Sequence, residues 1–308
     1  MKSSILMTKV IITGVTGFIG RGLAKRLLQS GTKVYGVGRE QKKLDEMTAW
    51  GDFVPVIADF EDYSQLHKLI SDRDFDMLCH LAWQGTTSTT ADYKDYNIQI
   101  KNIQASCDAA MAAANLQCKG CACSSSYQQG SIKINSDDRT TNPILYGTAK
   151  KCASDMFMAL AYKHKISCKN LILPNIYGID DKLNTAIVFF IKQMLADEAI
   201  NLISGVHQDD WVYIDDLIDG ILCAVTSEKK YADYYIGRRN ITTFKDKLVK
   251  MKSILNSKSE LLFGTYSENY RVDYSQFDLG ALFHDTGYEP KTDFTKSIIE
   301  TAGWIKSL

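Results

Sequence analysis

VIITGVTGFIG, residues 10–20, is the stretch that decides the fold of this chain. Its first three residues are β-branched and apolar, which predicts a strand. Beyond the glycines, apolar residues recur at helical spacing from Ile19 to Leu28, and Gly31 stands where helices commonly end. The stretch therefore predicts a strand, a glycine turn and a helix in direct succession.

This turn has the chemistry of a dinucleotide site. Glycines let the backbone approach a pyrophosphate, and the amides and dipole at the start of a helix stabilise its negative charge. A tight glycine turn without a ligand is the alternative. We expect a dinucleotide to contact the turn residues Gly14, Thr16, Gly17, Phe18, Ile19 and Gly20.

Strands and helices alternate along the next hundred residues. Apolar runs predict strands at residues 33–37, 53–57, 77–82 and 119–123, separated by helices at 41–50, 66–70 and 97–114. This alternation is typical of an α/β protein whose doubly wound parallel sheet is covered by helices on both faces. His80, on one of these strands, is expected to be a core residue.

Arg39 follows the second predicted strand, at the position where a cofactor's adenosine ribose is recognised. An acidic residue there would bind the ribose of NAD, whereas arginine would bind the 2′-phosphate of NADP. The sequence therefore favours NADP, as NADPH, over NAD, with a solvent-exposed arginine as the alternative. Asp59, after the third predicted strand, could reach the adenine or cap the next helix.

Composition excludes several classes of protein. Lys plus Arg and Asp plus Glu number 36 each, so no global field favours nucleic acid or an anionic membrane. No signal peptide or membrane span is expected, and eight dispersed cysteines favour a reducing, cytoplasmic setting. Cys118, Cys121 and Cys123 lack the remaining ligands of a zinc site, so no metal is expected.

Tyr146 and Lys150 form a candidate catalytic pair. On a helix they would lie one turn apart, where the ammonium could favour the ionised phenol and make it an acid or base near neutral pH. Two surface residues of an amphipathic helix are the alternative. The polar segment at residues 83–90 follows a strand end and is either a substrate or nicotinamide loop or an exposed linker.

The motifs together resemble the extended short-chain dehydrogenase/reductase family, which contains nucleotide-sugar epimerases, dehydratases and reductases. They occur in family order from residue 9 to about 220: T-G-V-T-G-F-I-G at 13–20, A-D at 58–59, H-L-A at 80–82, Asn97, S-S-S at 124–126, Y-G-T-A-K at 146–150, N-I-Y-G at 175–178 and W-V-Y-I-D-D-L at 211–217. Weaker similarity extends to G-Y-E-P at 287–290.

The resemblance implies a role for several residues. Ser125 would hydrogen-bond the reacting oxygen, Tyr146 would be the acid or base, and Lys150 would hold the nicotinamide ribose. Asn97 would support this network, and Leu81 and Ala82 would contact the cofactor. The substrate would meet Trp83, Thr86, Ser126, Tyr127, Asn175 and Arg271.

The family also implies a Rossmann-type architecture. Residues 1–173 would form the NADP-binding domain, with residues 205–230 returning to it, and residues 174–308 would mainly form a smaller, discontinuous substrate domain. A homodimer would form through a helix bundle that includes residues 97–114 and 146–162.

Residues around Ser125 narrow the expected chemistry. Dehydratases of this family follow the catalytic Ser or Thr with acidic residues, but Ser126 and Tyr127 stand here, so elimination is disfavoured. With Arg39 favouring NADPH, we expect reduction of a keto group on a nucleotide-activated sugar, a 4-keto-6-deoxyhexose. The run at 82–85 resembles that of 4-ketoreductases such as those that make CDP-abequose. A 4-epimerase with tightly held NAD and a non-catalytic NADP-binding regulator are the alternatives.

One departure concerns the substrate's diphosphate. Members of the family often place an arginine just before the segment at 211–217, but Gln208, Asp209 and Asp210 stand there. Carboxylates would repel a diphosphate. Arg238, Arg239 or Arg271 could replace the missing cation, and a reductase or epimerase acting on a small molecule of different charge is the competing hypothesis.

Overall fold

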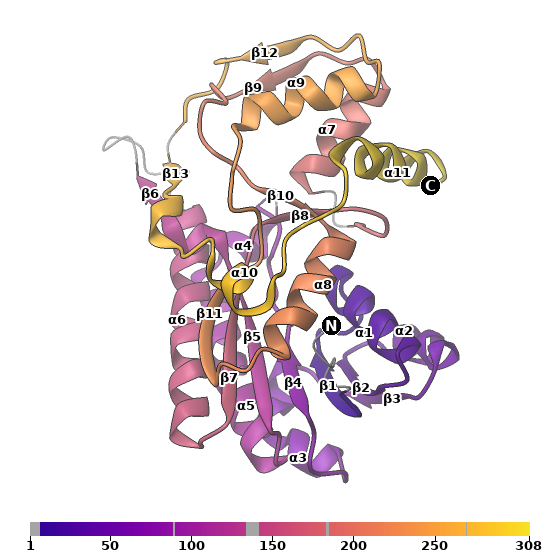
Figure 1. Ribbon diagram of the computed structural model, residues 1–308, viewed down its shortest axis with the longest axis vertical. Coiled ribbons are helices and arrows are strands. Elements are labelled where there is room, and N and C mark those ends of the chain that lie inside the picture. The colour runs from indigo at the N-terminus through magenta and orange to yellow at the C-terminus, as the bar shows by residue number, and fades with distance from the viewer. Residues whose placement is uncertain (1–6, 89, 134–141, 183–184, 269) are drawn as a thin grey trace.

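A parallel seven-stranded sheet forms the centre of the molecule (Figure 1). The computed structural model describes residues 7–88, 90–133, 142–182, 185–268 and 270–308. Every neighbouring pair in this sheet is parallel. In spatial order the strands are β11 (Tyr231–Tyr235), β7 (Ser167–Leu173), β5 (Gly120–Ser126), β4 (Met77–His80), β1 (Lys9–Thr13), β2 (Lys33–Gly38) and β3 (Phe53–Ile57).

Strand order reverses between β1 and β4. The chain adds β2 and β3 on one side of β1, and β4, β5, β7 and β11 on the other. In open α/β sheets, ligands bind outside the carboxyl ends of the strands at such a reversal. The glycine turn after β1 and residues 81–82 after β4 lie at this point. The expected α/β, Rossmann-type fold is confirmed.

Successive residues of the strands enter two different cores. Val10 and Ile12 pack with α1 (Phe18–Gln29) and α8 (Ile214–Val225), whereas Ile11 packs with α5 (Tyr96–Asn115) and α6 (Asn142–Lys163). This follows from the two-residue period of a strand that is buried on both faces. The outer connections on the β2–β3 side are α2 (Gln41–Met47), η1 (Thr48–Trp50), η2 (Phe60–Gln65) and α3 (Leu66–Leu69).

A smaller lobe covers the carboxyl end of the sheet (Figure 1). Its larger helices are α7 (Ala186–Leu195), α9 (Phe244–Ile254) and α11 (Phe294–Lys306), and it holds the parallel pair β9 (Ile200–Leu202) and β12 (Leu261–Phe263). Two further strand pairs connect the lobes: β8 (Asn175–Tyr177) with β10 (Trp211–Tyr213), parallel, and β6 (Ser131–Lys133) with β13 (Tyr270–Val272), antiparallel. The short elements α4 (Ala91–Lys94), η3 (Tyr127–Gly130), η4 (Tyr274–Gln276) and α10 (Ala281–Thr286) complete the described chain.

The segment that returns to the main sheet extends beyond residues 205–230, because β11 forms the edge strand of that sheet. The division into two domains at residue 173 stays a prediction. In the part of the chain that the structure describes, no helix is both long and apolar enough to cross a membrane.

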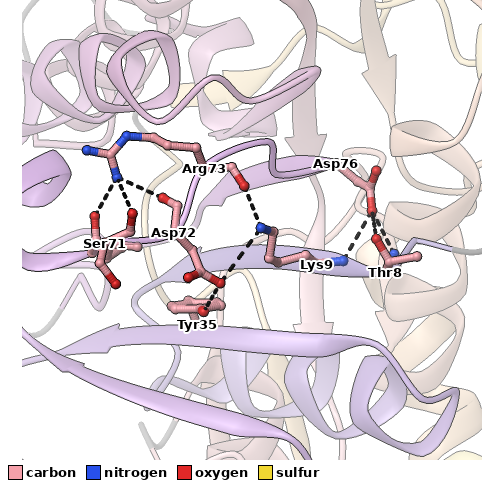
Figure 2. A network of polar contacts seen from close by, with 8 residues as sticks. Thr8, Lys9, Tyr35, Ser71, Asp72, Arg73 and Asp76 are labelled. Atoms are coloured by element: carbon pink, nitrogen blue, oxygen red, sulfur yellow. Dashed lines mark hydrogen bonds and ion pairs between the residues drawn. The ribbon is translucent and has the colours of Figure 1, made fainter.

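A polar network fixes the loop before β4 to the amino end of β1 (Figure 2). Asp76 Oδ2 accepts hydrogen bonds from Thr8 N at 2.6 Å, Thr8 Oγ1 at 2.8 Å and Lys9 N at 3.1 Å. Burial alone would raise the pKa of Asp76, but hydrogen bonds from Lys119 and Thr8 outweigh it and lower the pKa to about 2. This network lies at the opposite end of the sheet from the glycine turn, so it stabilises the fold rather than binding ligand.

Candidate active site

The glycine turn leaves no room for side chains at two of its positions. Gly14 has φ +70°, and a Cβ there would lie 2.7 Å from Ala82 Cα. A Cβ on Gly20 would lie 2.2 Å from the carbonyl oxygen of Gly14. The expected strand, turn and helix are confirmed, and the turn brings β1, α1 and the end of β4 into contact.

The start of α1 is open to an anion. Gly17 caps the helix without a side-chain hydrogen bond, and the first turn contains no acidic residue. The first amides of a helix need acceptors and attract negative charge. Together with the close-packed turn, this arrangement fits the pyrophosphate of a dinucleotide.

One cavity of about 860 Å³ joins the turn to the smaller lobe. Nearly all of the residues expected at the site contribute to its wall. They are Gly14, Thr16, Gly17, Phe18, Ile19, Gly20, Arg39, Asp59, Leu81, Ala82, Trp83, Thr86, Ser125, Ser126, Tyr127, Tyr146, Asn175 and Arg271.

Tyr146 is buried at the inner end of the cavity. Its ring stacks on Tyr93, with centroids 4.8 Å apart, and meets Trp83 edge-on. Burial raises the pKa of Tyr146 well above its usual value, and a hydrogen bond with the Ser126 side chain acts in the opposite direction. The hydroxyl of Ser125 instead donates to Gln129 Oε1 at 3.1 Å. Ser126 is thus the serine that contacts the tyrosine.

Lys150 lies one helical turn beyond Tyr146, just behind the cavity wall. Its Nζ donates to the Ser124 carbonyl at 3.4 Å and lies 3.8 Å from the centroid of the Trp83 ring. It is 6.0 Å from the centroid of Tyr146, and burial lowers the pKa of the lysine to about 8. The expected lowering of the tyrosine pKa is therefore not seen in this arrangement.

Asn97 is not brought to the site. It is exposed in the first turn of α5, where its backbone N–H donates to Asp95 Oδ1 at 2.8 Å. Asn102 lies on the buried side of the same helix and holds both backbone groups of Gln84, by bonds of 2.8 and 2.9 Å. The sequence pattern that could have identified Asn102 is its helical spacing from Gln99 and Ser106, which places all three on one face of α5, and all three are buried.

A carboxylate from the segment after β3 lies beside the arginine at the end of β2. Arg39 Nη1 lies 3.9 Å from Asp59 Oδ2, and both side chains are largely exposed. Asp59 also caps η2, because its Oδ1 accepts from Phe60 N at 2.8 Å while Asp62 accepts from its own N–H. A 2′-phosphate at this place would meet negative charge beside the guanidinium.

The substrate half of the cavity has acidic groups in its wall. Asp209 is buried there, and burial raises its pKa to about 6. Asp210 does not line the cavity; its Oδ2 accepts from Tyr235 Oη at 3.1 Å and Arg238 N at 2.8 Å. Arg239 pairs with Glu289 outside the cavity. Of the three arginines that could bind a diphosphate, Arg238, Arg239 and Arg271, it is Arg271 that lines the cavity.

Other wall residues were missed by sequence reasoning, among them Gln128, Phe190, His207, Phe244 and Glu268. His207 Nδ1 lies 2.7 Å from Glu268 Oε1, and the imidazole stacks on Phe244. These residues come from loops and helices far apart in the chain, and no local pattern marks them. His80, as expected, is a core residue between Thr13 and Ser106.

Comparison with known proteins identifies the family of this chain. The model of the NAD dependent epimerase/dehydratase family matches residues 10–237. UDP-glucuronate 4-epimerase 3 of Arabidopsis thaliana is 25% identical over 96% of this chain and 76% of its own length. The dTDP-4-dehydro-6-deoxyglucose reductase of Escherichia coli is 24% identical over 82% of this chain and 84% of its own.

Solved structures agree in fold. UDP-glucuronic acid 4-epimerase from Bacillus cereus, in complex with UDP-glucuronic acid and NAD, has a TM-score of 0.75 at 21% identity, covering 97% of this chain and 99% of that one. UDP-glucose 4-epimerase from Thermotoga maritima, with UDP-glucose, has a TM-score of 0.75 at 19% identity over the same shares.

These structures correct the expected cofactor. The epimerase structures from Bacillus cereus contain NAD, which contradicts the preference for NADP drawn from Arg39. The physical reason lies in Asp59, whose carboxylate comes from the segment after β3 and lies 3.9 Å from the Arg39 guanidinium. The expected family is confirmed: the chain belongs to the NAD-dependent epimerase/dehydratase family.

Proposed function

We propose that this protein is a nucleotide-sugar 4-epimerase that uses NAD. The observation that carries the proposal is the contact of Tyr146 with Ser126 in the same cavity as the open glycine turn. One cavity can thus hold a dinucleotide at β1 and bring a sugar hydroxyl to the tyrosine. The 4-epimerases among its relatives and similar structures support the same activity.

The expectation of a net reduction drew on NADP and on the run at 82–85, and the correction of the cofactor removes the first of these two grounds. An epimerase oxidises and re-reduces one sugar and therefore consumes no cofactor. The wall residues that would hold NAD are the glycine turn, Asp59 near the adenosine, and Leu81 and Ala82 after β4. When bound, NAD supplies reversible oxidation at the sugar carbon.

Tyr146 would exchange the proton of the reacting hydroxyl. Because burial favours its neutral form, Tyr146 holds a proton until a cation and hydrogen-bond donors stabilise the phenolate. Ser126 is in place to donate such a bond, and Lys150 is the cation one turn away on α6. Ser125, also in the wall, would orient the same oxygen.

The neighbours of Ser125 disfavour elimination. Loss of water next to the oxidised carbon needs a second acid or base. Ser126 and Tyr127 occupy the two positions after Ser125, and neither is a carboxylate. The keto sugar formed in this cavity would therefore be returned to an alcohol.

The test is Tyr146→Phe, assayed with a panel of UDP-, dTDP-, GDP- and CDP-linked sugars. Removal of the general acid is expected to lower kcat by roughly 10²–10⁴ while NAD still binds. Tyr162→Phe is the matched control, because Tyr162 is 68% exposed on the same helix and lies outside the cavity wall. Chromatography of the C4 epimers measures turnover, and epimerisation by Tyr146→Phe at the wild-type rate would refute the role of the tyrosine.

The reductase remains a defined outcome of this panel, since the Escherichia coli relative is a dTDP-4-dehydro-6-deoxyglucose reductase. Stoichiometric consumption of reduced cofactor with a 4-keto sugar, without epimerisation of any alcohol, would replace the proposal by that activity. Cofactor binding with no turnover of any sugar would favour a non-catalytic regulator.

A further inference from the structure

Asp209 is a fixed carboxylate in the substrate half of the cavity. Trp211 Nε1 donates to its Oδ2 at 2.7 Å, and Asn175 Nδ2 donates to its Oδ1 at 2.7 Å. The side chain is buried in the wall and comes from the segment just before β10. Two charge-assisted bonds therefore fix its position before any ligand arrives.

A chain of hydrogen bonds connects Asp209 to the reacting end of the cavity. The hydroxyl of Tyr127 donates to Asn175 Oδ1 at 2.9 Å, and Tyr127 follows Ser126 in sequence. Tyr127, Asn175 and Asp209 all line the cavity. Asp209 therefore faces the sugar-nucleotide part of the cavity rather than the adenosine end at β2.

Lys247 contacts Asp209 but does not present its charge to a ligand. Lys247 Nζ donates to the backbone oxygen of Asp209, to Thr242 O at 3.1 Å and to Thr242 Oγ1 at 2.8 Å. These bonds use all three donors of an ammonium group. Lys247 is buried and absent from the wall, so its ammonium does not cover the cavity side of the Asp209 carboxylate.

A second carboxylate adds to the negative charge of the cavity wall. Glu268 lies in the same wall, where it is paired with His207 at 2.7 Å and accepts from Ser204 Oγ at 3.3 Å. Arg271 has no ion pair with another described residue and is the cation available to a diphosphate. Among the described residues that line the substrate half, Arg271 is the one lysine or arginine, and it faces two carboxylates, so no positive charge is left for a further anionic group on the ligand.

We infer that Asp209 selects nucleotide sugars whose sugar ring carries hydroxyl or amino groups and rejects those that carry a carboxylate. The inference rests on the proposed function. It predicts that the substrate of this chain differs from that of the UDP-glucuronate 4-epimerases to which it is similar. A sugar hydroxyl can donate to a fixed carboxylate, whereas a uronate would place two like charges in a poorly solvated cavity. The expected discrimination is at least about tenfold in affinity.

Asp209→Asn removes the charge and keeps the shape. The new amide can still accept from Trp211, and a flip of the Asn175 amide lets Asn175 accept from position 209 and donate to Tyr127. The hydrogen-bond network can therefore form again without leaving a buried polar atom unpaired. Asp215→Asn is the matched control, because it removes the same charge from a side chain that is 67% exposed outside the cavity wall.

The experiment measures dissociation constants by calorimetry for two matched pairs, UDP-glucose with UDP-glucuronate and GDP-mannose with GDP-mannuronate. Wild type should bind the neutral member of the preferred pair at least about tenfold more tightly. Asp209→Asn should bring the two members within about threefold by tightening the uronate, and Asp215→Asn should leave the ratio unchanged.

Two results would overturn the inference alone: a wild-type protein that binds the uronate as tightly as the neutral sugar, or a ratio unchanged by Asp209→Asn. Selective binding of neutral sugars without any Tyr146-dependent turnover would leave the inference standing and refute the epimerase. A protein that binds no member of either pair would overturn both.

Discussion

His80 shows how one buried side chain connects the elements beneath the site. It lies at the end of β4, with Nδ1 2.8 Å from Thr13 Oγ1 on β1 and Nε2 3.0 Å from Ser106 Oγ on α5. Burial, with a smaller contribution from the charge of Lys150, lowers its pKa to about 3. His80 is therefore neutral in the folded protein at every ordinary pH.

This histidine should make stability depend on pH. The unfolded chain binds a proton at His80 below about pH 6.5, whereas the folded protein does so only near pH 3, so stability falls as the pH drops through that window. Between pH 7 and 5 the loss from this group is about 2 kcal/mol. The free energy of unfolding, measured by urea denaturation, should fall correspondingly less between these two pH values in His80→Gln than in wild type. His284→Gln is the control, because His284 is exposed. If His80→Gln lost as much unfolding free energy between the two pH values as wild type does, the account would be contradicted.

At the residue scale, sequence reasoning succeeded where chemistry restricts a position to few residue types. The glycine turn and Tyr146 both line the cavity as expected. It failed where the choice depends on which side of an element faces inward. Asn97 is exposed whereas Asn102 is buried, and Arg39 has Asp59 beside it, which no local pattern could show.

At the scale of elements, the close approach of α6 to η3 positions Tyr146. Gly147 follows Tyr146, and a Cβ there would lie 2.0 Å from the carbonyl oxygen of Gln128 and 2.5 Å from its carbon. These are backbone atoms, so a side chain at this position has to move one element away from the other. The glycine therefore sets the distance between Tyr146 and the serines that end β5.

Gly147→Ala should separate α6 from η3. Overpacking of this kind typically costs about 1–3 kcal/mol, and displacement of Tyr146 should lower kcat by at least about tenfold. Gly303→Ala on α11 is the matched control, because no atom lies within 4 Å of its added Cβ and alanine favours a helix by up to about 1 kcal/mol. Thermal denaturation and epimerase assays would check both variants, and wild-type values for Gly147→Ala would contradict the packing argument.

The longer elements were predictable because periodic patterns mark them. The strand expected at residues 53–57 is β3, and the helix expected at 97–114 is α5 (Tyr96–Asn115). The pairs β8 with β10 and β6 with β13 were not predictable. Three-residue strands carry no measurable period, and their partners are distant in sequence.

At the scale of the whole molecule, α5 and α6 expose apolar side chains away from the sheet. Tyr96 and Ile100 on α5 are 60% and 58% exposed, and Met156 and Tyr162 on α6 are 45% and 68% exposed. Homodimerisation through these helices is the expectation that stays open. Exposed apolar surface of this kind commonly marks an interface.

Sedimentation velocity tests the dimer. Wild type should sediment as a dimer at micromolar concentration, and Ile100→Glu should sediment as a monomer because it buries a charge in the interface. Ile299→Glu, at a 55% exposed position on α11, should remain dimeric. A monomeric wild type would contradict the expectation.

The substrate half of the cavity is a property of the whole molecule. Tyr127, Asn175, Asp209 and Arg271 come from η3, β8, the segment before β10 and β13. Sequence showed that Asp209 stood at an unusual position, but only the fold shows that Asp210 points elsewhere and that Lys247 donates to two backbone oxygens and to the Thr242 hydroxyl. Charge in a cavity depends on such pairings, which local sequence does not encode.

The fate of hydrogen at C4 tests the central claim most directly. The preferred nucleotide sugar would be prepared with deuterium at C4 and converted by the wild-type enzyme in ordinary water, and the product would be analysed by NMR. An epimerase that oxidises and re-reduces the sugar in one cavity predicts a C4 epimer that keeps the deuterium, with no net change in the oxidation state of the cofactor. Loss of the deuterium to solvent, or release of a 4-keto sugar with stoichiometric reduction of the cofactor, would contradict it.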